Sequence, residues 1–136
     1  MLGGFATYNQ RDWAMQSTNG TVVAFTNYAS VTDPNTWATY DAGAHPTGSN
    51  FASTLTSSKT ISTLRFDDSG TNANTLNLGS GVTLSIGARP AATAGPLASG
   101  GILVTPEAGT NAVTISGGAI TNAPWNDNLI IHQYNT

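Results

Sequence analysis

The sequence predicts an all-β fold, and three observations support that prediction. Charged residues make up only 8% of the chain, against about 25% in an ordinary soluble domain. Polarity comes instead from Thr, Ser, Asn and Gly, which suit strands and the turns between them. Short segments alternate apolar and polar residues with a period of two, and glycine-rich breaks separate them. Many short strands therefore explain the chain better than long helices do.

The second half of the chain carries the clearest strand patterns. The predicted strand segments are TISTLRFDD, NTLNLGSGVTLSIGA, GGILVTP, NAVTISGGAIT and NLIIHQY. The apolar residues that alternate within them are Leu64, Phe66, Leu76, Leu78, Val82, Leu84, Ile86, Val113 and Ile115. This alternation places one face of each strand against a core and the other towards solvent.

A series of apolar residues recurs at nearly constant spacing. Leu64, Val82, Ile102 and Ile120 follow one another at almost equal separations along the chain. Such separations predict a β-solenoid with coils of roughly 18–20 residues. The alternative is an antiparallel β-sandwich built from hairpins. Tight hairpin signals are scarce, since Asn19-Gly20 is the only Asn-Gly, so we favour the solenoid.

The chain is expected to form one continuous domain. Residues 1–50 are rich in aromatic side chains and predict N-terminal coils or a cap, while residues 51–136 predict regular coils. An excursion is expected near 88–99, where two prolines interrupt the strand pattern. Within the first part, FATYNQRDWA at 5–14 is loosely echoed at 25–38. The echo is interpreted either as two stacked units or as a chance pairing of aromatic residues.

Four stretches of the sequence resemble bacterial autotransporter-associated β-strand repeat proteins. They are TISTLRFDDSGTNANTLNL, GGILVTPEAGTNAVTISGGAIT, LIIHQYNT and the opening GGFATYNQRDWA. The resemblance implies a right-handed parallel β-helix that is part of a longer cell-surface or secreted protein. It also implies roles in adhesion, surface display or self-assembly, and it supplies no catalytic residues. We therefore expect an extracellular or outer-surface location.

The charge pattern argues against nucleic acid as a partner. The net charge is −3 and the chain has four basic residues, which form no cluster that could displace counterions from phosphates. No apolar run approaches the roughly 20 residues of a membrane span. The opening MLGGFATYNQ lacks the basic and apolar regions of a signal peptide, so a secreted protein would carry one upstream. The chain has no cysteine, which excludes disulfides and thiolate metal sites.

The sequence offers weak candidates for catalysis. Asp67-Asp68 lies beside Arg65, but adjacent strand residues point to opposite faces and cannot converge on a substrate without a bulge. His45 and His132 have no acid or second histidine at useful spacing. We therefore predict a non-enzymatic protein without cofactor or metal, and consider a polysaccharide lyase or hydrolase less favoured.

Carbohydrate binding is the alternative function. The aromatic faces of Trp13, Trp37 and Trp125 are candidate glycan contacts, because such faces suit the apolar side of a sugar ring. Trp13 and Trp37 would align if the two echoed segments were stacked. The competing interpretation is that these large side chains fill the interior.

The C-terminal segment predicts a surface for self-association. Its alternation places Leu129, Ile131 and Gln133 on one face, with Ile130, His132 and Tyr134 on the other. No amphipathic helix, charged terminal strand or proline follows Trp125, so a terminal coil here would expose unpaired backbone. We expect this edge either to continue into a further coil or to join another copy end to end. The predicted edge residues are Leu129, Ile130, Ile131, His132 and Tyr134.

Overall fold

The computed structural model describes residues 6–38, 44–46, 51–67, 70, 73–87, 100–122 and 128–136. Within them the strands are β1 (Thr7–Tyr8), β2 (Asp12–Gln16), β3 (Val22–Ala24), β4 (Ala29–Val31), β5 (Ala44–Pro46), β6 (Ala52–Leu55), β7 (Lys59–Ile61), β8 (Thr63–Phe66), β9 (Asn74–Ile86), β10 (Gly100–Val104), β11 (Val113–Asn122) and β12 (Leu129–Gln133). Two short 3-10 turns accompany them, η1 (Pro34–Thr36) and η2 (Pro106–Ala108). The predicted all-β class is confirmed.

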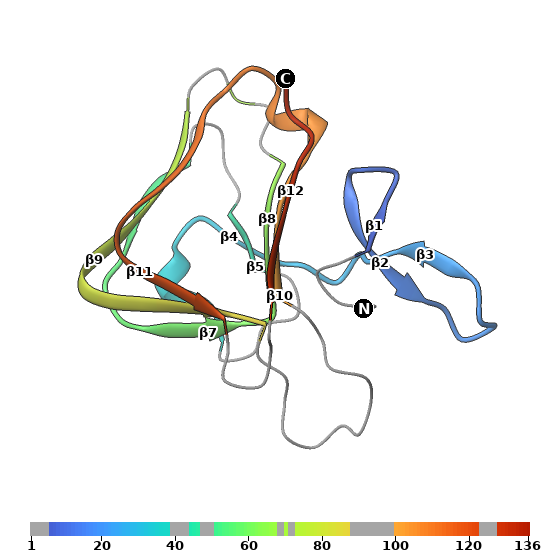
Figure 1. Cartoon of the computed structure of the whole chain (residues 1–136), viewed down its shortest axis with the longest axis horizontal. Helices are drawn as coiled ribbons and strands as arrows, with labels where there is room; N and C mark the ends of the chain where they lie inside the picture. Colours follow the sequence, from blue (N-terminus) through green and yellow to red (C-terminus); the bar gives the residue numbers. More distant parts are fainter. Residues whose placement is uncertain are drawn as a thin grey trace.

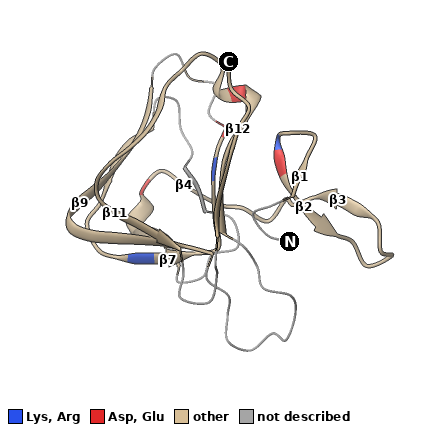
Figure 2. Ribbon diagram, viewed as in Figure 1, with Lys and Arg blue, Asp and Glu red and all other residues tan. Residues whose placement is uncertain are grey.

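Two of the three sheets are parallel. One has the strand order β12-β10-β8-β5-β4, and the other has the order β11-β9-β6, with β7 also paired to β9. Every described strand pair in these two sheets is parallel. The third sheet, β1-β2-β3, is antiparallel. In Figure 1 β8, β10 and β12 overlie one another, while β9 and β11 bend together around the opposite side, so the described strands outline a triangle. Figure 2 shows how few charged residues these strands carry: Lys59 lies on β7 and Arg65 on β8.

The bend in β9 lets one strand pair with two others. Its first arm pairs with β6, so that Leu55 lies opposite Leu78, and its second arm pairs with β7, so that Ile61 lies opposite Ile86. Strand β11 follows the same bend, with a register shift between Gly117 and Ala119. Glycine is required at this corner of β11. Gly117 has φ +69°, and a side-chain carbon there would overlap the carbonyl oxygen of Leu78.

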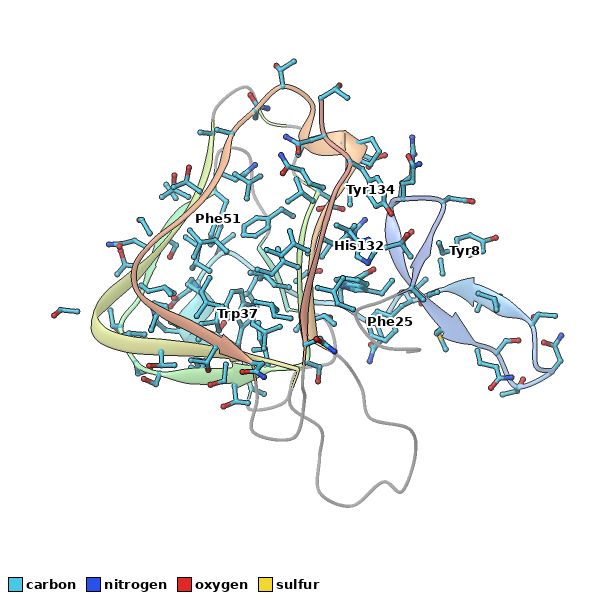
Figure 3. All side chains as sticks on the ribbon, in the orientation of Figure 1. Tyr8, Phe25, Trp37, Phe51, His132 and Tyr134 are labelled. Carbon is cyan, nitrogen blue, oxygen red and sulfur yellow. The ribbon has the colours of Figure 1, made fainter. Side chains whose placement is uncertain are left out.

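The core fills the inside of the triangle. Alternate residues of the paired strands form stacked columns, such as Leu64 on β8 opposite Ile102 on β10 and Ile131 on β12. Trp37 and Phe51 also lie inside the triangle (Figure 3) and are almost completely buried. The period-two alternation read from the sequence therefore identifies the core-facing positions correctly on β8 and β9.

The prediction of a uniform coil length is wrong. Leu64 pairs with Ile102, and the intervening Val82 lies in the other sheet. The interval along the chain between Leu64 and Ile102 is nearly twice that between the paired residues Ala44 and Leu64. The interval from Ile102 to its partner Ile131 is intermediate. The recurring apolar residues therefore lie on different sides of the triangle. Spacing along the chain alone cannot distinguish a neighbouring strand from a strand on another side.

The N-terminal prediction is also corrected in part. The echoed segments are not stacked copies, because Trp13 lies on β2 of the antiparallel sheet whereas Trp37 follows η1 inside the core. Asn19-Gly20 lies in the loop between β2 and β3. Strands β4 and β5 from the same region join the five-stranded parallel sheet. The excursion expected at 88–99 lies outside the described residues.

We expect Gly117→Ala to destabilise the protein more than Gly81→Ala. Both glycines have a positive φ, so alanine at either site costs about 1 kcal/mol of backbone strain. Only Gly117 is also pressed against a neighbouring strand, whereas Gly81 has open space where a side-chain carbon would lie. The loss at Gly117 should reach about 3 kcal/mol. Urea denaturation of the two variants measures the difference, and equal losses would contradict the close approach at this corner.

Candidate functional site: a covered end and an open end of the strand stack

One end of the β11-β9-β6 sheet is covered by a side-chain amide. The outer edge of β6 meets Asn35 of η1, whose Nδ2 donates to the Thr54 carbonyl oxygen (2.9 Å). The Asn35 Oδ1 accepts from the backbone N–H of Thr56 (2.8 Å) and from its hydroxyl (2.9 Å). In a parallel ladder, one residue bonds the carbonyl before and the N–H after the residue opposite it. The Asn35 amide therefore takes the place of a strand residue opposite Leu55.

The amide of Asn35 is held in place by Asp33. The carboxylate of Asp33 caps η1 by accepting from the backbone N–H of Asn35 (2.9 Å) and from its Nδ2 (2.8 Å). The backbone hydrogen bond first, then the side-chain one and the positive charge of Lys59, lower the pKa of Asp33 below its ordinary value. Because Nδ2 also bonds Thr54, both amide hydrogens of Asn35 are used.

The same segment also contacts a side chain of the neighbouring strand β7. The Nζ of Lys59 donates to the carbonyl oxygen of Trp37 (2.9 Å). The Trp37 side chain is 1% exposed and packs in the core cluster with Phe51. Residues 33–37 therefore form what we call the amide cap, which bonds the outer edge of β6 and accepts one side-chain hydrogen bond from β7.

The opposite end of both sheets is open. Strands β11 and β12 are the outermost strands of their sheets, and no described strand pairs with their outer edges. Ile131, which continues the core column of Ile102, is 63% exposed, and Ile120 on β11 is 37% exposed. Neither strand carries a charged residue (Figure 2). An uncharged strand edge above exposed core residues is a surface on which another strand can pair.

The register of β12 confirms the predicted alternation of its faces. Ile131 lies opposite Ile102 of the core, while His132 lies opposite Leu103, which faces outwards from the sheet. Of the predicted edge residues, Leu129 packs partly against the core. Ile130 is half-buried on the outward side with His132 and Tyr134.

The outward face of β12 is covered by the N-terminal sheet β1-β2-β3. The ring of Trp13 meets that of His132 edge-on at 5.9 Å between centroids, and His132 stacks on Tyr134. The Thr7 and Tyr134 hydroxyls are 3.2 Å apart. Figure 3 shows Phe25 on the same outer side of the triangle as His132 and Tyr134. The face of β12 is therefore satisfied within the chain, and its edge is what remains available.

A buried cation attaches the N-terminal sheet to the stack. The side chain of Arg65 on β8 is 9% exposed and forms ion pairs with Asp12 (3.3 Å from its Nη2) and with Asp67. Its Nε donates to the carbonyl oxygen of Arg11 (2.7 Å), and its guanidinium carbon lies 4.6 Å from the ring centre of Tyr28. Burial raises the pKa of Tyr28 well above its ordinary range. Arg65 is thus neutralised and fully surrounded, which makes its burial tolerable.

The predicted glycan contacts are not at the surface. Trp13 is 0% exposed and Trp37 is 1% exposed, so the prediction that they stack on sugar rings is wrong, and the competing prediction of interior packing is confirmed for both. Their exposure depends on which segments fold over them, which local sequence does not specify. Trp125 lies outside the described residues.

The candidate catalytic residues that the structure describes, Asp67 and His132, have different partners. Asp67 is engaged by Arg65 and His132 by two aromatic rings, while Asp68 and the side chain of His45 lie outside what the structure describes. The described residues contain no group of three or more His, Asp or Glu side chains that could hold a metal. No described helix is long and apolar enough to cross a membrane.

Sequence analysis missed the amide cap. The run Asp33-Pro34-Asn35-Thr36 is a turn signal, because aspartate caps a helical turn and proline suits its first position. That signal locates η1 but gives no sign that Asn35 meets Thr54 on a distant strand.

No family model, curated protein or solved structure matches the chain. We therefore infer the function from the geometry of the two ends.

We expect Arg65→Met to destabilise the protein by about 2–3 kcal/mol, because Asp12 and Asp67 would lose the buried cation between them. Arg11→Met is the matched control. The Arg11 side chain is 63% exposed and pairs with Glu107 at the surface, so its loss should cost less than about 1 kcal/mol. Urea denaturation compares the two variants. Similar losses would show that Arg65 does not anchor the N-terminal sheet.

The amide cap should loosen in acid. Because the folded pKa of Asp33 is lowered, its contribution to stability is present above the unfolded pKa of about 3.9 and is lost as pH falls through the folded pKa. Hydrogen exchange of the Thr56 N–H, expressed as a protection factor, measures this change. In Asp33→Asn, which has no carboxyl to protonate, the acid-dependent drop should be smaller. An identical drop in both proteins would assign the effect to other groups.

Proposed function

We propose that the chain is a non-enzymatic structural segment of a bacterial cell-surface or secreted protein, built as a right-handed parallel β-helix. It would act as a stalk, an adhesin or a self-assembling subunit joined through its open end. The observation that carries this proposal is the parallel pairing of strands that are not consecutive in the chain. Between β8 and its partner β10 the chain passes through β9 of the other sheet, and between β10 and β12 it passes through β11.

Parallel neighbours require a crossover connection. Here the crossovers are themselves strands that pair with one another, as β9 does with β11 over both of its arms. This pairing supports a solenoid, in which each coil contacts only the coils before and after it. An antiparallel sandwich would join neighbouring strands through hairpins. The right hand of the helix follows the strong preference for right-handed crossovers between parallel strands.

The described charged residues support a structural role. Arg65 fastens the N-terminal sheet together with Asp12 and Asp67, and Asp33 holds the amide cap. Each of these groups is committed to a partner within the fold, rather than directed towards a common point where a substrate could bind. These charged side chains therefore attach one segment of the chain to another.

The open end supports a role in extended structures. Strands β11 and β12 present uncharged edges at the place where a further coil would stack, about 4.8 Å away. The surface location rests on the sparse charge, the Thr- and Asn-rich composition and the resemblance to autotransporter-associated repeat proteins. These features are typical of elongated structural proteins rather than of enzymes.

Spin labels on one outward column test the architecture. Thr54, Asn77 and Ser116 follow one another across β6, β9 and β11 and are exposed, and the chain has no native cysteine to interfere. Labels on Thr54→Cys with Asn77→Cys, or on Asn77→Cys with Ser116→Cys, should lie one strand spacing apart and show strong dipolar broadening. Labels on Thr54→Cys with Ser116→Cys should show weaker broadening, two spacings apart.

A matched control pairs Thr54→Cys with Thr121→Cys, which lies on the other arm of the bend and should show the weakest coupling. Strong coupling in only one of the two neighbouring pairs would contradict the in-register column. The non-enzymatic part is tested on a panel of polysaccharides. Cleavage that disappears in Asp67→Asn would overturn it.

A further inference from the structure

The two ends of the strand stack differ in what they can accept. At the covered end, the amide cap occupies the outer edge of β6, and Lys59 ties β7 to the same segment. The remaining outer strand there, β4, is only three residues long. At the open end, ten residues of β11 and five of β12 have no described strand on their outer side. Among the outer strands of the two parallel sheets, β11 and β12 therefore offer the longest described edges for pairing from outside.

The open end also defines what its partner must look like. A partner has to present two strand edges that follow the bend of β11 and the straight side of β12 at once (Figure 1). Its contacting strands must carry no charged side chains, and they must bring apolar side chains to Ile131 and Ile120. The open end of a second copy of this chain meets all of these requirements.

The geometry points to a symmetric dimer, and we propose that two copies of the chain join open end to open end about a two-fold axis. This inference rests on the parallel β-helix proposed above. The axis would run through the middle of β12 at Ile131 and through the corner of β11 at Gly117-Gly118, which lies opposite β12 in Figure 1. Because a closed two-fold contact uses the same surface on both partners, it ends with the dimer.

The backbone of β12 suits this pairing. The N–H of Tyr134 donates to the Val104 carbonyl oxygen on the β10 side. Alternate residues of a strand direct their backbone groups to opposite edges, so the groups of Leu129, Ile131 and Gln133 lie on the open edge. Around the axis Ile131 would face its own copy in a hydrogen-bonded antiparallel pair. Its side chain would remain on the core side and meet the second Ile131 there.

The bent strand β11 pairs under the same axis. A two-fold axis through its corner exchanges its two arms, so residues 113–117 of one copy would run antiparallel to residues 119–122 of the other. This brings the 37%-exposed Ile120 against the arm that carries Val113 and Ile115. Both sheets would continue across the interface, and the two partly open cores would close on each other.

Filament growth is opposed by the covered end. Head-to-tail stacking would require the open end of one copy to pair with β6 and β7 of the next, where the amide cap already holds Thr54 and Thr56. The amide cap thus makes the dimer the final product. This differs from the end-to-end chains that the sequence alone suggested.

Light scattering and native mass spectrometry of the full chain test the proposal. We expect a monomer–dimer equilibrium without larger species. Ile131→Lys places two like charges opposite each other at the axis and should raise the dimer dissociation constant at least about tenfold. Val22→Lys is the matched control, since Val22 is 55% exposed on β3, away from the open end, and the constant should not change.

Two single-cysteine variants locate the axis. Under mild oxidation Ile131→Cys should form a disulfide-linked dimer, and Val22→Cys should not. Asn35→Ala frees the edge of β6 and should convert part of the protein into larger assemblies. Filaments from the unaltered chain would overturn the proposal, as would a dimer that Ile131→Cys cannot cross-link. A monomer at all concentrations would also overturn it. If the spin-label column were intact in that monomer, the proposed function would stand and a further coil of a longer chain would be the partner of the open end.

Discussion

The two parallel sheets depend on the pairing of each strand backbone with strands from other parts of the chain. Backbone N–H and C=O groups that lose water on folding must find partners, and within these two sheets the neighbouring parallel strand supplies them to the inner strands. Inner strands such as β9 satisfy this requirement on both edges, with β11 on one side and β6 and β7 on the other. The problem is therefore confined to the two ends. What happens at each end determines what the molecule can join.

At the end formed by β6, a few side-chain hydrogen bonds satisfy part of the exposed strand edge. A single amide, fixed by Asp33, supplies the donor and the acceptor that a whole strand would have brought to Thr54 and Thr56. On the flank of the stack, the N-terminal sheet covers Leu103, His132 and Tyr134. This cover leaves the edge of β12 untouched. Faces and edges are thus treated separately, and in the two parallel sheets the longest outer edges without a described neighbouring strand are those of β11 and β12.

Several features followed from the sequence because they are local. The alternation of Leu64 and Phe66, and of Ile131 with His132, directly states which side chains face the core. Other features depend on contacts between distant segments. The coil length was wrong because Leu64 and Val82 belong to different sheets, and no local pattern reports the side of the triangle on which a strand lies. The sequence left open whether Trp13 and Trp37 contact glycans or fill the interior, because aromatic residues alone do not tell which segments cover them. The role of Asn35 was missed because one amide in a polar turn looks like any other.

The unequal distances along the chain between paired residues have a consequence of their own. Nearly twice as many residues separate Leu64 from Ile102 as separate Ala44 from Leu64, yet the residues of each pair lie opposite each other on neighbouring strands of one sheet. Pairing fixes the residues on the flat sides but leaves open how much chain is used to turn from one side to the next. Insertions and deletions can therefore accumulate at the vertices while the walls keep their spacing. Such a molecule can vary the length and sequence of its loops while the paired strands keep the same arrangement.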